Sequence, residues 1–282
     1  MTPSLKDAQI SFVGGGNMAS AIIGGLLAKD ISKQHIFVAE PWDVNRDKMA
    51  ALGVRTTADN VEASRDADIV IIAVKPQVAQ VACTELGAAW ADREALPVVI
   101  SIAAGITVAS YVEWFTQGAA GRTPPIVRVM PNTPALVGEG ASGLFANEGV
   151  SSGEKELATA LLASVSRAAE WVDKESLLDV VTGISGSGPA YFFAFVEHLI
   201  TAGTSLGLSE EQATRLAKQT ALGAGKMLVE SSEEPSQLRK NVTSPNGTTH
   251  AALVSFENDG LKDIVGRAVK AATDRAEELG RA

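Results

Sequence analysis

The sequence predicts an α/β protein in which a mostly parallel sheet, with helices on both faces, is followed by an all-helical region. Up to residue 172, short apolar runs alternate with segments of helical periodicity, which is typical of a parallel sheet covered on both faces. From Lys174 to the end, only helical periodicity remains. A chain of 282 residues is also long for a single hydrophobic core. We therefore expect two domains, at residues 1–172 and 173–282.

The strands of the first domain are short runs rich in apolar and β-branched residues. The clearest is DADIVIIAVK, because residues 69–74 form a continuous apolar run, as a strand buried on both faces requires. In chain order the expected strands are QISFVG, HIFVAE, VRTT, DADIVIIAVK, PVVISIAAG, PIVRVMPN, ASGLFAN and AAEWVD. The expected helices between them are residues 18–29, DVNRDKMAAL, QVAQVACTELGAAW, ITVASYVEWF and GEKELATALLASV, the last opened by Ser151 or Ser152.

The second domain reads as helices throughout. AYFFAFVEHLITAGTSLG is apolar on most faces, SEEQATRLAKQTALGAGKMLVES begins at a Ser209 cap, and GLKDIVGRAVKAATDRAEELG is amphipathic. EEPSQLRKNV and AALVSFENDG are shorter helices on either side of a polar loop, TSPNGTTH. Residues 190–201 have too few polar side chains for a solvated face, so we expect them to be buried between two chains.

Composition narrows the class of protein. The formal net charge is −9 without a basic stripe, which argues against nucleic acid or an anionic membrane surface as partner. The single cysteine, Cys83, excludes a disulfide framework, and three scattered histidines make a metal site unexpected. MTPSLKDAQI lacks the apolar core of a signal peptide, and no uncharged apolar span of about 20 residues follows. We expect a soluble cytoplasmic protein.

A glycine-rich turn follows the first strand and opens the first helix. In VGGGNMASAIIGG, Gly14, Gly16 and Ala19 fit the pattern G-x-G-x-x-G/A. The first glycine allows a tight turn, the second lets backbone approach a pyrophosphate, and the small third residue lets helix and strand pack closely. The helix N-terminus offers free N–H groups to the phosphates. This context predicts a dinucleotide-binding domain of the Rossmann type.

Three further segments lie where parallel strands end, at the edge that binds ligands in such sheets. Glu40 ends the second strand, where an acid commonly bonds the ribose of NAD; the alternative is a solvated turn residue. Lys75 in AVKP either points at the ligand edge or is an ordinary strand-end lysine. The small side chains of SIAAG, residues 101–105, suit a backbone lying close to a nicotinamide ring, although small residues also serve plain packing.

Six segments occur in an order that resembles the pyrroline-5-carboxylate reductase family. They are FVGGGNMA, AVKP, ISIAAGIT, VRVMPNTPALVGEGASG, VTGISGSGPAYFF and NVTSPNGTTHAAL. The resemblance covers nearly the whole chain, and SGSGPAY and TSPNGTT are its specific parts. It implies reduction of the cyclic imine 1-pyrroline-5-carboxylate to proline with NADPH or NADH. It also implies a homodimer or dimer-based higher oligomer, with helices interleaved and the active site at the subunit interface.

The same resemblance implies the site residues. Cofactor contacts fall on Val13, Gly14, Gly15, Gly16, Asn17, Met18, Asn60, Ala73, Val74, Lys75, Pro76, Ile102, Ala103 and Ala104, with Glu40 added from its position at the second strand. Substrate contacts fall on Glu175, Asn241, Gly247, Thr248 and Thr249. Glu40 stands where many relatives carry a small polar residue, which leaves the choice between NADPH and NADH open.

The loop TSPNGTTH, residues 243–250, can meet two needs of such a substrate. After a Pro-Asn-Gly turn, the N–H groups of Gly247, Thr248 and Thr249 stand at a helix start, where a carboxylate is favoured. The Thr249 hydroxyl can hydrogen-bond the imine nitrogen and relay a proton, so we expect Thr249 to be catalytic. The alternative is an elaborate helix cap.

Two rival functions share parts of this pattern. A 3-hydroxyacid dehydrogenase needs a catalytic lysine on the helix that opens the second domain, but residues 183–214 contain none. A nucleotide-sensing regulator has no use for a substrate loop of this kind.

Overall fold

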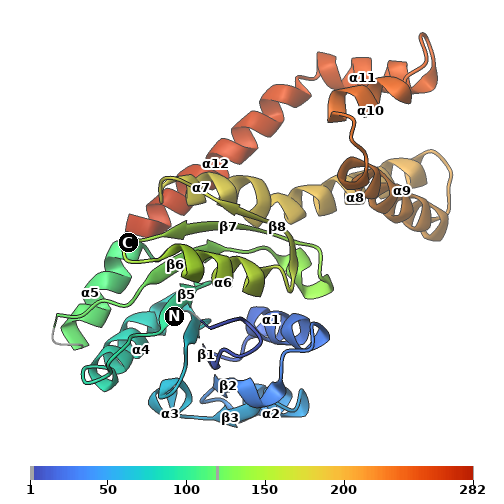
Figure 1. Cartoon of the computed structure of the whole chain (residues 1–282). Coiled ribbons are helices and arrows are strands. Elements are labelled where there is room, and N and C mark those ends of the chain that lie inside the picture. Colours follow the sequence, from blue (N-terminus) through green and yellow to red (C-terminus); the bar gives the residue numbers. More distant parts are fainter. Residues whose placement is uncertain (1–2, 119–120, 282) are drawn as a thin grey trace. The chain divides into compact units, whose positions relative to one another are not determined.

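The computed structural model describes residues 3–118 and 121–281, and the strands of its first 171 residues form one eight-stranded sheet (Figure 1). The strand order is β3-β2-β1-β4-β5-β6-β7-β8. The strands are β1 (Ile10–Val13), β2 (Ile36–Ala39), β3 (Arg55–Thr57), β4 (Ile69–Ile72), β5 (Val98–Ser101), β6 (Ile126–Met130), β7 (Gly140–Ala146) and β8 (Ser166–Trp171). The sheet is parallel except where β7 runs antiparallel to β6. The predicted fold class is confirmed.

Two hydrophobic clusters cover the two faces of the sheet. Alternate residues of a strand point to opposite faces, so Phe12 of β1 lies in one cluster and Val13 in the other. The first cluster includes buried side chains of α1 (Asn17–Ala28) and α6 (Ser152–Leu162). The second includes α4 (Pro76–Ala89) and α5 (Val108–Gly118). Because all four residues of β4 are buried, helices cover both sides of it, as its apolar run predicts.

Local signals fix several helix boundaries. Ser151 caps α6 in a reciprocal capping box with Glu154. Ser209 caps the helix Glu210–Glu230 in the same way with Gln212. The remaining elements of this part of the chain are α2 (Asp43–Ala51), the short helix α3 (Asn60–Ser64), and the 3₁₀ turns η1 (Lys33–His35) and η2 (Thr133–Val137). The last three are absent from the sequence-based expectation, because elements this short carry little periodicity.

Residues from Leu177 onward are helical, as expected. The elements are α7 (Leu177–Val181), the π-helical turn η3 (Thr182–Gly186), α8 (Gly188–Ser205), α9 (Glu210–Glu230), α10 (Pro235–Asn241), α11 (Thr248–Asn258) and α12 (Leu261–Arg281). The chain forms two compact units. Unit 1 comprises the chain up to Gly186 and again from Ala272, and unit 2 comprises Ser187–Ala271. Within the described residues, every helix is too short or too polar to cross a lipid bilayer.

The outer strands of the sheet carry charged side chains. At one edge, exposed Arg55 of β3 stacks over the Phe37 ring, with its guanidinium carbon 4.0 Å from the ring centroid. At the other edge, β8 exposes Arg167 and Glu170. Each of these strands has a neighbour on one side only.

Candidate active site

The glycine turn after β1 is held against the end of β4. Gly14 has φ of +103°, a conformation that favours glycine, and a Cβ there would lie 2.7 Å from the Ala73 carbonyl oxygen. Its N–H donates to the Ala39 carbonyl oxygen at 2.8 Å. The turn therefore joins the carboxyl ends of β1, β2 and β4, and a larger residue at this position would push them apart.

The second glycine of the motif opens α1 toward free space. Gly16 is the N-cap of α1, and no side chain of the described residues caps the helix. Apart from its chain neighbours, no atom of these residues lies within 4 Å of the position a Gly16 Cβ would take. An N-terminus without a capping side chain leaves N–H donors and the positive end of the helix dipole for an anion. The turn thus fits the pyrophosphate of a dinucleotide, with Asn17 and Met18 beginning the helix and Ala19 buried below it.

Glu40 is buried beside this turn. Glu40 is only 7% exposed, so the alternative interpretation, a turn residue in contact with solvent, is wrong. One carboxylate oxygen accepts the Gly15 N–H at 2.8 Å, and the other accepts the Trp42 N–H at 3.0 Å. Arg46 donates to the backbone carbonyl of Glu40 at 2.9 Å and pairs with Asp43. Each carboxylate oxygen keeps a further lone pair that a ribose hydroxyl can use.

The other predicted cofactor contacts lie along the same sheet edge. Ala73 and Val74 follow β4, and Lys75 and Pro76 begin α4, whose N-cap position is Lys75. Asn60 opens α3 and donates to Glu85 at 3.0 Å. Because β1, β2, β4 and β5 are parallel, their carboxyl ends meet at one edge.

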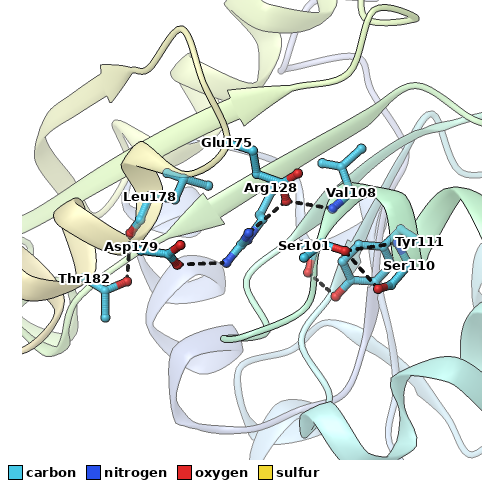
Figure 2. A network of polar contacts seen from close by, with 10 residues as sticks. Ser101, Val108, Ser110, Tyr111, Arg128, Glu175, Leu178, Asp179 and Thr182 are labelled. Carbon is cyan, nitrogen blue, oxygen red and sulfur yellow. Dashed lines mark hydrogen bonds and ion pairs between the residues drawn. The ribbon is translucent and has the colours of Figure 1, made fainter. Parts of the chain in front are cut away.

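Ile102, Ala103 and Ala104 follow β5 at that edge. The Ile102 N–H donates to the Ile72 carbonyl at 3.1 Å. The Ala103 N–H donates to the Ser101 hydroxyl at 3.3 Å, and this hydroxyl also bonds to the buried Tyr111 hydroxyl (Figure 2). Burial raises the pKa of Tyr111, so this phenol stays protonated and can donate. The segment is therefore held in place by β4 and by Ser101, while Ala104 is exposed.

The polar loop 243–250 lies in unit 2 and ends at the start of α11. Asn246 has φ of +58°, which the predicted Pro-Asn-Gly turn requires. Gly247 is the N-cap, and no side chain among the described residues caps this helix. The Gly247 N–H already donates to the Ser244 carbonyl at 3.0 Å, and the Ala251 N–H donates to the Gly247 carbonyl, so the donors left at the helix start belong to Thr248, Thr249 and His250. The elaborate-cap alternative finds no support in these contacts.

Asn241 closes α10 just before this loop. Its amide nitrogen donates to Glu233 at 2.8 Å, and its amide oxygen accepts from Gln237 at 2.7 Å. These two contacts fix which way the amide faces. Glu233 was missed by sequence reasoning, and its place before Pro235 at the start of α10 was the available signal.

Glu175, expected with the substrate contacts, lies in unit 1 and not in unit 2 with the other four. Its carboxylate accepts from Arg128 at 2.8 Å and from the Val108 N–H at 2.7 Å (Figure 2). Arg128 also lies 3.9 Å from Asp179. Burial raises the pKa of Asp179 and the Arg128 charge opposes this, while Glu277 and Glu175 raise it further.

Nearly the whole chain is similar to known proteins. Residues 175–279 match the family model for pyrroline-5-carboxylate reductase dimerisation, and residues 9–105 match that for NADP oxidoreductase, coenzyme F420-dependent. The chain is 45% identical, over 276 residues and 98% of both chains, to a pyrroline-5-carboxylate reductase of Pseudomonas aeruginosa. The chain belongs to the pyrroline-5-carboxylate reductase family.

Other relatives agree with this membership. A pyrroline-5-carboxylate reductase of Vibrio alginolyticus is 40% identical, with 98% of both chains covered. The solved pyrroline-5-carboxylate reductase of Coxiella burnetii has a TM-score of 0.91 and 39% identity, covering 98% of this chain and 99% of that one. The pyrroline carboxylate reductase of Plasmodium falciparum, solved with NADP bound, has a TM-score of 0.80 and 32% identity over the same shares. The resemblance seen in the sequence is confirmed.

Proposed function

We propose that the chain reduces 1-pyrroline-5-carboxylate to L-proline with NADPH or NADH, the last step of proline synthesis. The observation that carries this is the similarity to reductases of this name over 98% of the chain, which includes both the glycine turn and the polar loop. The match to the dimerisation model supports a homodimer or dimer-based oligomer.

The cofactor is proposed to lie along the carboxyl edge of the sheet. The glycine turn and the first turn of α1, from Val13 to Met18, bind its phosphates, and Glu40 with Asn60 faces the adenosine ribose. Ala73, Val74, Lys75 and Pro76 line the middle of the site, and Ile102, Ala103 and Ala104 support the nicotinamide. When bound, the cofactor supplies the hydride that reduces the imine carbon.

The substrate is proposed to bind at the start of α11. The Thr248 and Thr249 N–H groups receive its carboxylate, each charge-assisted bond contributing about 1.5–3 kcal/mol. The Gly247 N–H lies within the turn at 3.0 Å from Ser244, so Gly247 contributes backbone shape and not a donor. Asn241, with its amide fixed by Glu233, presents the remaining polar contact. No arginine is needed, which suits a chain of net charge −9.

Thr249 is proposed to manage the proton. Its hydroxyl donates a hydrogen bond to the imine nitrogen, and the nitrogen takes up one proton as the adjoining carbon is reduced. A threonine hydroxyl is not acidic enough to lose this proton outright. The hydroxyl therefore gives its proton to the nitrogen while it takes a proton from a water molecule, so Thr249 ends the step as a neutral hydroxyl. Most of the rate enhancement then comes from placing the reactants.

Turnover tests the proposal directly. Purified protein is expected to consume NADPH or NADH only when pyrroline-5-carboxylate is present, and to form proline in equal amount. A 3-hydroxyacid as substrate in the reverse direction, with oxidised cofactor, is the control for the rival dehydrogenase. Absence of proline formation by folded, cofactor-binding protein would overturn the proposed function.

A further inference from the structure

The residues that lead from β5 into α5 form a turn, residues 102–107, that is fixed at both ends. At its start, the Ile102 N–H donates to the end of β4 and the Ala103 N–H to Ser101, as described above. At its end, the Val108 N–H donates to the Glu175 carboxylate at 2.7 Å. Val108 is the first residue of α5, so Glu175 caps this helix from a distant part of the chain.

Arg128 holds the capping carboxylate in place. It projects from the middle of β6, its side chain is 9% exposed, and its guanidinium lies 2.8 Å from the same Glu175 oxygen that accepts from Val108 (Figure 2). Asp179 approaches the guanidinium from α7 at 3.9 Å. A buried arginine without a carboxylate would be costly, so Arg128 and Glu175 depend on each other for their positions.

The outer side of the turn meets the end of α12. Gly105 has φ of +76°, and a Cβ there would lie 3.5 Å from the Leu279 carbonyl oxygen. Thr107, Arg128, Glu175 and Glu277 border a common cavity. The turn is thus confined between the sheet edge, the Arg128–Glu175 pair and the end of α12, all within unit 1.

We propose that Arg128 and Glu175 are positioning residues for hydride transfer: through the Val108 N–H they fix the 102–107 turn that supports the nicotinamide. The proposal rests on the proposed function, which assigns Ile102, Ala103 and Ala104 to the cofactor. It gives Glu175 a role toward the cofactor in place of the substrate contact implied by the family resemblance. The two roles predict different kinetic changes.

Four variants separate the contacts. Glu175→Ala removes the cap and the ion pair, and Arg128→Met removes the charge that holds Glu175. Glu175→Gln keeps an oxygen that can accept from Val108. The double variant Arg128→Met with Glu175→Gln keeps that acceptor and removes both charges of the Arg128–Glu175 pair together, so it remains informative if Glu175→Ala does not fold.

Asn147→Ala is the matched control. The Asn147 side-chain oxygen accepts from the Ile126 N–H at 3.0 Å, at the amino end of the same strand that carries Arg128. Its loss removes one hydrogen bond from β6, but at the end far from the ligand edge of the sheet. Damage to the strand alone should therefore appear in this variant too.

Three measurements are made on each variant. Hydrogen exchange of the peptide covering residues 102–108 is followed in the cofactor-free protein, and the dissociation constant for NADH and NADPH is followed by nucleotide fluorescence. Steady-state kinetics then gives kcat and the KM for pyrroline-5-carboxylate.

We expect Glu175→Ala and Arg128→Met to speed exchange of the peptide covering residues 102–108 and to weaken cofactor binding. We expect kcat to fall about 10- to 100-fold, the scale of a misplacement of about 1 Å. The substrate KM should stay near wild type, and Glu175→Gln and the double variant should recover most of the loss.

Two outcomes would overturn the proposal. One is a raised KM for pyrroline-5-carboxylate with unchanged cofactor affinity and unchanged exchange at residues 102–108, which would make Glu175 a substrate contact. The other is a set of changes no larger than those of Asn147→Ala. If the wild type forms no proline, the proposed function fails, while the exchange and nucleotide-binding measurements still decide whether Arg128 and Glu175 fix the turn.

Discussion

Replacing Glu40 with glutamine is expected to raise the preference for NADPH over NADH. The carboxylate is buried at the end of β2, where the adenosine ribose is proposed to lie, and its oxygens accept two backbone N–H groups at 2.8 and 3.0 Å. Glutamine has nearly the same shape and keeps one acceptor oxygen, so the glycine turn retains part of its support. The charge is lost, and with it the repulsion of a 2′-phosphate.

The expected magnitude is that of the repulsion between a carboxylate and a 2′-phosphate held by the same ribose. One unit charge at about 6 Å in an effective dielectric constant of about 20 repels another by about 3 kcal/mol. Arg46, which donates to the Glu40 backbone carbonyl at 2.9 Å, offsets part of this. We expect a net gain of about 1–2 kcal/mol, so the ratio of kcat/KM for NADPH to that for NADH should rise about 5- to 30-fold.

The assay is kcat/KM for both cofactors in the wild type, Glu40→Gln and Glu40→Ser. Serine removes the charge and both backbone contacts. The melting temperature of Glu40→Ser should therefore lie below that of Glu40→Gln, while the ratio of kcat/KM for NADPH to that for NADH should rise in both variants. An unchanged ratio in both variants would refute the reasoning. Glu40 would then serve only to brace the glycine turn through Gly15.

Three other changes test separate parts of the molecule. Thr249→Val should lower kcat about 10- to 1000-fold with a smaller rise in substrate KM, whereas Thr248→Val should leave kcat largely intact; equal kcat in wild type and Thr249→Val would remove the proton role. The raised pKa of Asp179 means that its contribution to stability is present below its ordinary pKa of 3.8 and is lost as pH rises through the folded value. The melting temperature of Asp179→Asn relative to wild type should therefore increase as the pH is raised from below 3.8 to neutrality, and a constant difference across that range would count against it. Phe193 on α8 is 69% exposed in the single chain, so Phe193→Glu should weaken self-association, and sedimentation at low micromolar concentration should show a dimer or larger only in the wild type.

Local chemistry explains which parts of the fold the sequence predicts well. The glycine turn is set by a tight backbone conformation at Gly14 and a close approach to Ala73, so its residue pattern is visible within a few positions. The strands buried on both faces read as continuous apolar runs, and Ser151 and Ser209 mark helix starts through capping boxes. By contrast, α3 has five residues and no periodicity to detect.

Contacts between distant segments explain what the sequence does not reveal. Arg128 within the apolar run of β6 signals that a buried charge needs a partner, but nothing local indicates that Glu175 supplies it. The same holds for Glu233, which precedes α10 and accepts a hydrogen bond from Asn241 at the other end of that helix. Residue type and order predict the glycine turn and the polar loop, whereas the residues that hold Glu175 and Asn241 in place emerge only from the folded chain.

The charged outer strands bear on how copies of this chain avoid unwanted aggregation. A strand at a sheet edge exposes unpaired N–H and C=O groups, and a flat apolar edge invites another chain to continue the ladder. Here one edge is a strand of three residues that carries Arg55, and the other exposes Arg167 and Glu170. Extending the sheet into a neighbouring molecule would bury these charged side chains and remove their hydration. Protection against fibril-like stacking is thus built into the two strands that contribute least to the core.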